Sequence, residues 1–114
     1  MANESFHYES LPGSKESTRI YRLTGPLVLN TMFDLQDELN KDHYALTIFD
    51  LSGVPYMDSA GLGVLVNCHV SASRRNGKVV VVGALPRILD LFKITKVDSV
   101  FTMAPTVAEA EAMD

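Results

Sequence analysis

Cysteine and basic residues are both scarce in this chain. The single cysteine, Cys68, cannot form an internal disulfide. It lies in an apolar stretch where a thiol packs as a small hydrophobic group, and this favours a reducing compartment. Ten Lys and Arg are outnumbered by fourteen Asp and Glu, which leaves a net charge of −4. Without a basic stripe a nucleic-acid-binding surface is not expected. We therefore expect a cytoplasmic protein that does not bind nucleic acid.

Long apolar segments are also missing. The longest apolar run, residues 79–85 with Gly83 included, is far shorter than the ~18 residues of a membrane-spanning helix. Residues 1–10 show neither the basic start nor the apolar core of a signal peptide. The sequence therefore predicts no membrane insertion.

Motifs for catalysis, cofactors and metals are absent as well. A nucleophile elbow around Ser59 would need glycine at position 57, where this chain has Met57. None of the three histidines is followed by a convincing acid partner for a triad. Gly61-Leu62-Gly63 begins a dinucleotide fingerprint, but Val66 replaces its last glycine. The histidines and the cysteine lack metal-ligand spacing. We therefore predict no catalytic residue, no cofactor and no metal, and a protein that is not an enzyme.

The overall composition is that of a folded domain. Of the 114 residues, 46% are hydrophobic and 21% are charged, both close to the globular average. This length is sufficient for one hydrophobic core. We expect a single domain over residues 1–114, with an ordered core at about residues 6–113.

The hydrophobic pattern alternates between the periods of strands and helices. Strands are predicted at residues 6–10, 18–24, 45–51, 78–82 and 99–103. Helices are predicted after Thr31, over residues 59–75, from Pro86, and from Thr106 to near residue 114. The first two strands should pair in antiparallel fashion, and the continuous apolar run at 45–51 is typical of a buried parallel strand. The pattern predicts an α/β fold with a mostly parallel sheet.

Several local signals predict where these elements begin and end. Thr31 is expected to cap the first helix, and Asn76-Gly77 to end the helix over residues 59–75. Residues 11–14 are expected to form a turn, and Thr106 to form a capping box with Glu109. The inward face of the helix that begins at Pro86 is predicted to hold Leu85, Ile88, Leu89 and Phe92.

The polar pair Asp58-Ser59 stands where a strand-to-helix loop enters a helix. Backbone N–H groups are free there, and the helix dipole is positive. Asp and Ser are also common N-caps, so capping alone accounts for the pair. We interpret Gly61 and Gly63 as a bare surface beside Ser59 that another protein can approach closely.

The run Met57-Asp58-Ser59-Ala60-Gly61-Leu62-Gly63 resembles the signature of STAS domains, specifically the bacterial anti-sigma factor antagonists. The resemblance extends from about residue 6 to the C-terminus. It includes the lead-in Leu51-Ser52-Gly53-Val54 and Leu91-Phe92 in the helix after the fourth strand. It implies the STAS fold, with four or five strands, about four helices and an antiparallel first strand at the edge.

The resemblance also implies a function. Ser59 would be phosphorylated by a partner that is both anti-sigma factor and serine protein kinase, and a serine phosphatase would reverse this. Unphosphorylated protein would bind the anti-sigma factor and free the sigma factor for transcription, and phosphorylation would release the complex. The implied partner-binding residues are Asp58, Ser59, Ala60, Gly61, Leu62 and Gly63.

One position departs from the family pattern, and two alternatives stay open. Family members commonly carry an acid where this chain has Val28, in the run Gly25-Pro26-Leu27-Val28. The apolar residues of this run favour a STAS subunit that docks constitutively in a lipid-transport or larger signalling complex. A small α/β enzyme is the second alternative. Ser52 and Ser99 are other possible phosphate acceptors near predicted strand ends.

Overall fold

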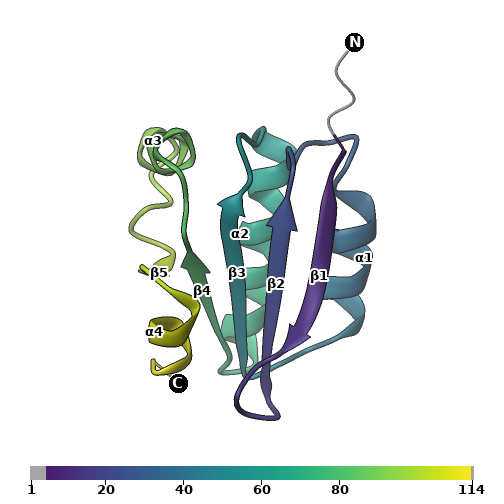
Figure 1. Cartoon of the computed structure of the whole chain (residues 1–114), viewed down its shortest axis with the longest axis vertical. Helices are drawn as coiled ribbons and strands as arrows, with labels where there is room; N and C mark the ends of the chain where they lie inside the picture. Colours follow the sequence, from purple (N-terminus) through teal and green to yellow (C-terminus); the bar gives the residue numbers. More distant parts are fainter. Residues whose placement is uncertain (1–4, 114) are drawn as a thin grey trace.

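The computed structural model describes residues 5–113. A five-stranded sheet forms the centre of this part of the protein (Figure 1). The strands are β1 (His7–Pro12), β2 (Thr18–Thr24), β3 (Leu46–Gly53), β4 (Lys78–Val82) and β5 (Thr102–Ala104). They lie side by side in chain order. β1 is antiparallel to β2 and all other pairs are parallel. This confirms the predicted mixed sheet with an antiparallel first strand at its edge.

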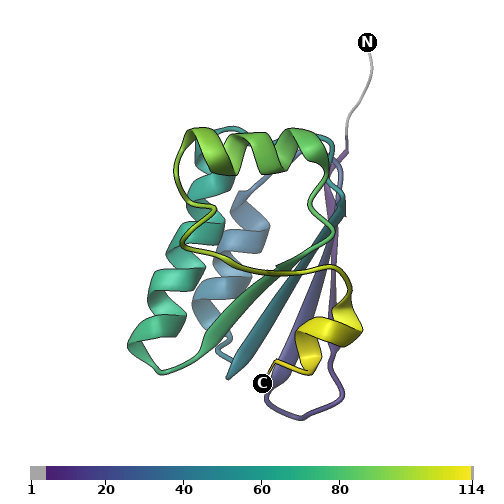
Figure 2. The same ribbon diagram turned by 90° about the vertical axis from the view of Figure 1, so that its left-hand side faces the viewer.

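Four helices of the described chain surround the sheet. They are α1 (Phe33–Lys41), α2 (Ser59–Arg74), α3 (Pro86–Ile94) and α4 (Val107–Glu111). Figure 2 shows α1 and α2 on one face of the sheet and α4 on the other, while α3 lies across the end where β4 finishes. In the described residues no helix is both long and apolar enough to cross a membrane.

The sheet is buried on both faces, because successive side chains of a strand point to opposite sides. Toward α1 and α2, the core contains Tyr21, Leu23, Phe49, Leu51, Val79, Val81, Leu35, Leu62 and Leu65. Toward α4, a smaller cluster contains Ile20, Leu46, Ile48, Val80, Val82, Ala104 and Ala110. This double burial explains why β3 and β4 are almost continuously apolar in sequence.

The predicted bounds hold for β2 and β4 but shift elsewhere. β1 continues to Pro12, which pairs with Arg19, although a turn was predicted there. Proline fits because an edge strand leaves alternate N–H groups without a ladder partner. β5 lies at Thr102–Ala104 rather than at 99–103, and α4 ends at Glu111, before the predicted end. Residue 114 lies outside the described part of the chain.

The predicted Thr31 cap is wrong. The N-cap of α1 is Met32, which makes no side-chain capping bond. The Thr31 hydroxyl instead accepts a hydrogen bond from the Val28 N–H at 3.0 Å and donates one to the Pro26 carbonyl at 2.8 Å. Thr31 therefore closes the loop before α1 instead of starting the helix.

The other predicted signals for the starts and ends of helices are mostly confirmed. Thr106 caps α4, because its hydroxyl accepts from the Glu109 N–H at 3.1 Å. After α2 the left-handed conformation is taken by Asn76, with φ of 59°, and not by Gly77. Asn tolerates this region better than most residues. Leu85 is exposed, in contrast to the prediction, because it precedes the first turn of α3.

The packing of α3 predicts a contrast between two of its apolar residues. Phe92 is fully buried and lies 5.1 Å from Phe101 between ring centroids, whereas Ile94 is 78% exposed. Phe92→Ala should lower the free energy of unfolding by about 3–5 kcal/mol. Ile94→Ala should change it by no more than about 0.5 kcal/mol. Urea denaturation followed by circular dichroism measures both values, and similar losses in the two variants would contradict this packing.

Candidate functional site

The candidate site lies at the end of the sheet where the parallel strands finish. The loop from β2 to α1, the loop from β3 to α2, and helix α3 all gather there (Figure 1). In open α/β sheets the carboxyl ends of the strands are the usual binding edge. Asp58 and Ser59 lie in the second of these loops and at the start of α2.

The Asp58 carboxylate connects two segments that are distant in sequence. Its Oδ1 accepts a hydrogen bond from the Gly61 N–H at 2.9 Å, which makes Asp58 the N-cap of α2. Its Oδ2 accepts from the Leu29 N–H at 3.1 Å. These backbone hydrogen bonds, the one from Gly61 foremost, hold the pKa of Asp58 below its usual range. The side chain is exposed, and it carries its negative charge at neutral pH.

Further contacts join the same two loops. The Leu27 N–H donates to the Tyr56 carbonyl at 3.2 Å, and the Gly25 N–H donates to the Gly53 carbonyl at 2.8 Å. Leu27 and Met57 also form an isolated parallel bridge. Together with the Thr31 hydroxyl, these bonds hold residues 25–31 firmly against the start of α2. We call residues 25–31 the support loop.

The two glycines of the motif have different roles. Gly61 is buried, and a Cβ at this position would collide with the Leu27 carbonyl of the support loop. The interpretation of Gly61 as bare surface is therefore wrong, because its missing side chain makes room for the support loop. Apart from the backbone of its own helix and its chain neighbours, a Cβ added at Gly63 would meet no atom within 4 Å, so this glycine does leave open surface.

The implied partner-binding residues lie within the first turns of α2 but at different depths. Asp58 and Ser59 are exposed, and Ala60 and Gly63 are half-buried. Gly61 and Leu62 are buried beneath them. A partner that approaches this end of α2 would meet the Asp58 and Ser59 side chains first, while Gly61 and Leu62 support them from below.

Sequence reasoning missed two exposed apolar side chains in the support loop and at the start of α1. Leu29, at the tip of the support loop, is 52% exposed, and Phe33, the first residue of α1, is 56% exposed. The sequence suggested Pro26, Leu27 and Val28 as the apolar surface. Pro26 and Leu27 are buried instead. A leucine next to Asn30 in a short loop was the available signal, but periodicity does not reveal exposure in a loop.

An apolar groove lies beside the loop that precedes α2. It is about 270 Å³ in volume and runs between α3 and the loop that carries Tyr56 and Met57. Its α3 lining is Arg87, Ile88, Asp90, Leu91 and Ile94. Ligand pockets for small molecules usually measure about 300–1,000 Å³, so this groove is small for one.

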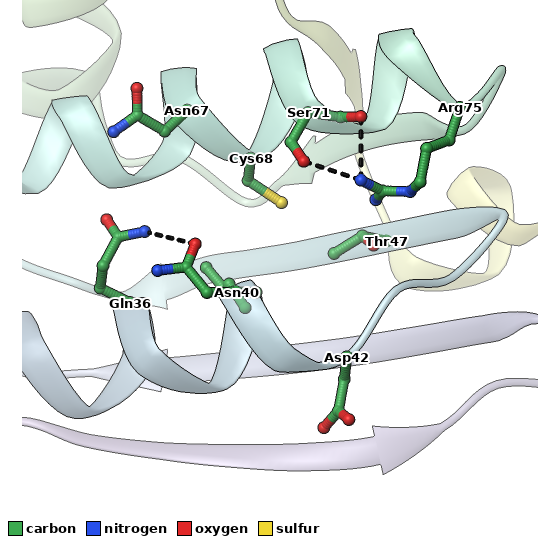
Figure 3. Close-up of a pocket in the computed structure, with 9 residues that line it drawn as sticks. Gln36, Asn40, Asp42, Thr47, Asn67, Cys68, Ser71 and Arg75 are labelled. Carbon is green, nitrogen blue, oxygen red and sulfur yellow. Dashed lines mark hydrogen bonds between the residues drawn. The ribbon is translucent and has the colours of Figure 1, made fainter.

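The space between α1 and α2 is polar and narrow (Figure 3). Its volume is about 20 Å³, enough for little more than one water molecule. The Arg75 guanidinium donates to the Ser71 hydroxyl at 2.7 Å, and Gln36 donates to Asn40 at 3.2 Å. Burial raises the pKa of the neighbouring Cys68 thiol to about 11, which leaves this thiol unreactive at neutral pH.

The remaining candidate groups do not converge. The His69 ring packs edge-on against Phe101, with 6.2 Å between centroids. Within residues 5–113 no three His, Cys, Asp or Glu side chains lie close enough to hold a metal ion.

The fold and the site together define a class of protein. This is a small α/β domain with a serine exposed at a helix N-terminus on a rigid support. Comparison with known families matches residues 13–110 to the STAS domain. The chain belongs to the STAS domain family.

Individual relatives agree with this assignment. An anti-sigma-B factor antagonist of Listeria monocytogenes is 32% identical over 84 residues, which cover 74% of this chain and 58% of that protein. The chain thus spans less than two thirds of that relative's length. A crystal structure of an anti-sigma factor antagonist from Mycobacterium paratuberculosis superposes with a TM-score of 0.83 at 21% identity, covering 98% of this chain and 96% of that one.

A third similar structure is that of SpoIIAA, a Bacillus cell fate determinant, in its phosphorylated form. Its TM-score is 0.72 at 18% identity, and the match covers 96% of this chain and 98% of SpoIIAA. At such identities the two solved structures establish the shared fold.

The two motif glycines predict opposite effects of the same substitution. Gly61→Ala should destabilise the protein by about 1–3 kcal/mol, because the new methyl group overlaps the Leu27 carbonyl. Gly63→Ala should stabilise it by about 0.5–1 kcal/mol, because alanine is the better helix former and the site is open. Thermal denaturation of the matched pair measures both, and changes of the same sign would contradict the assigned contacts.

The Asp58 hydrogen bonds predict a shared pH response. The amide signals of Leu29 and Gly61 should titrate together in NMR spectra, with a midpoint below the usual aspartate range. Because the folded-state pKa is depressed, the stability from Asp58 is present above the unfolded pKa and is lost as pH falls through the folded pKa. Asp58→Asn, which keeps a capping side chain, should abolish this titration. Independent midpoints for the two amides would argue against a shared acceptor.

Proposed function

We propose that this protein is an anti-sigma factor antagonist that works as a partner switch. In this proposal the unphosphorylated protein binds an anti-sigma factor and so frees a sigma factor to direct transcription. The anti-sigma factor is also the serine kinase that phosphorylates Ser59, and phosphorylation releases it. A serine phosphatase restores the binding form. The observation that carries the proposal is the exposed Ser59 at the first position of α2, on a rigid support, in a STAS domain.

A phosphate on Ser59 is compatible with the folded domain. It adds roughly −1.5 to −2 charges at pH 7. Backbone N–H groups and the positive dipole end at the start of α2 favour a negative charge there. The modification should therefore leave the fold intact, and its effect should appear where a partner binds.

The charge beside Ser59 makes the phosphate an effective block. Asp58 is already ionised, and with the phosphate the local charge reaches roughly −2.5 to −3. A partner that covers this surface would have to desolvate both groups, and unpaired or like-charge contacts cost several kcal/mol. Reversal of a 99:1 population of bound protein needs about 5.5 kcal/mol, which a single phosphate can approach.

The domain itself contributes no catalysis in this proposal. It is a substrate for a kinase and a phosphatase, and a binding module for the anti-sigma factor. The exposed apolar side chains of Leu29 and Phe33 favour a second candidate function, in which the domain docks constitutively in a lipid-transport or larger signalling complex. In that case Ser59 would only help to start α2.

The proposal predicts how Ser59 variants behave toward the partner. Wild type, Ser59→Ala and Ser59→Asp serve as baits in lysate of the native organism, and the retained ATPase-like kinase is then purified. Wild type and Ser59→Ala should bind it equally, while Ser59→Asp should bind at least about tenfold more weakly, a difference of about 1.4 kcal/mol. With ATP, intact-mass spectrometry should detect one phosphate on wild type and none on Ser59→Ala.

Two control variants and a folding check accompany this experiment. Ser52→Ala and Ser99→Ala remove the other candidate acceptors and should leave phosphate incorporation unchanged. Circular dichroism should show that Ser59→Asp remains folded. Equal retention of one partner by all three baits would reject the switch and support constitutive docking.

A further inference from the structure

The support loop presents an apolar side chain to solvent although it is held firmly in place. Leu29 is exposed at the tip of the loop, and Phe33 is exposed one turn further along the chain. A single exposed leucine or phenylalanine is common on protein surfaces. Several large exposed apolar side chains close to one another mark a binding surface. Leu29 lies next to Asp58, because the Leu29 N–H donates to its carboxylate, and Phe33 follows four residues later at the start of α1.

The loop is already ordered in the unbound chain. The Thr31 hydroxyl bonds both the Val28 N–H and the Pro26 carbonyl, and the Thr31 N–H donates to the Val28 carbonyl at 3.0 Å. The backbone of such a loop loses little conformational freedom when it binds a partner. An apolar side chain presented in this way can be fully desolvated in a pocket of a partner, which is the setting in which binding hot spots occur.

We propose that Leu29 and Phe33 form an apolar anchor that inserts into an apolar recess of the anti-sigma factor, and that Asp58 couples this anchor to the phosphorylation state of Ser59. This rests on the function proposed above, and it names the part of the surface that supplies the affinity.

The charges around the anchor specify the border of that recess. Asp34 follows Phe33 directly, and Asp37 lies one turn further on the same face of α1. Burial, together with the negative charges of Glu38, Asp34 and Asp37, raises the pKa of Tyr8 to about 12. The surface beside Phe33 is therefore negative. The recess should be bordered by Lys or Arg side chains on the side that faces α1.

The coupling follows from shared hydrogen-bond donors. Asp58 holds the Leu29 amide with one oxygen and the Gly61 amide with the other. A phosphate on the adjacent Ser59 repels this carboxylate and competes for the same N–H groups. Phosphorylation would thus weaken the bond that positions Leu29, in addition to placing charge at the interface.

Binding of the purified anti-sigma factor retained by the wild-type bait tests the anchor. Isothermal titration with Leu29→Ala and with Phe33→Ala should show affinities at least about tenfold weaker than wild type. Val70→Ala is the matched control, since Val70 is 41% exposed but lies further down α2. It should bind like wild type. The double variant Asp34→Asn, Asp37→Asn should bind with a weaker dependence on NaCl concentration.

Hydrogen exchange tests the coupling without the partner. In the phosphorylated protein the Leu29 amide should exchange several-fold faster than in the unmodified protein. The Gln36 amide, which bonds the Met32 carbonyl at 2.9 Å at the start of α1, should not change.

The outcomes separate this proposal from the function on which it rests. If wild type binds the anti-sigma factor and both alanine variants bind equally well, the anchor is rejected and the partner switch stands. If wild type binds no anti-sigma factor, both are rejected. Unchanged exchange of the Leu29 amide on phosphorylation would reject the coupling through Asp58.

Discussion

The arrangement of this end of the molecule depends on one carboxylate that accepts two backbone hydrogen bonds. Asp58 bonds the Gly61 N–H within its own helix and the Leu29 N–H in a loop from another part of the chain. The first bond starts α2, and the second brings the support loop against it. Since an ionised carboxylate makes stronger hydrogen bonds than a neutral group, a single exposed side chain can hold both segments.

The steric fit of Gly61 completes this arrangement. Only a residue without a side chain lets the Leu27 carbonyl approach the first turn of α2. Ser59 is thereby presented at the start of a helix that packs against the support loop, beside the ionised Asp58 carboxylate and near the exposed Leu29. Such a surface suits a protein partner whose affinity comes from apolar contact and whose release comes from added charge. The same surface without modification would suit constitutive docking, so the chemistry at Ser59 separates the two functions.

Much of the architecture could be predicted because its signals are local. The bounds of β2 and β4 agree with the alternating and β-branched runs, and Ser59 begins α2 as its capping pattern indicates. Predictions failed where a local signal competes with a distant contact. Thr31 has the character of an N-cap, yet its hydroxyl is taken by Val28 and Pro26. The observed ends of β1 and β5 differ from the predicted ones, because strand pairing, and not intrinsic preference, decides where an edge strand stops.

The sequence by itself determined the order of strands and helices, the two buried faces of the sheet and the place of Asp58-Ser59 at a helix start. These features follow from periodicity and capping, which act over a few neighbouring residues. Only the tertiary structure decided that Gly61 packs against Leu27, that Asp58 reaches Leu29, and that Leu29 and Phe33 stay exposed. Each of these depends on where a loop from another part of the chain lies, and the spacing of residues along the sequence does not contain that information.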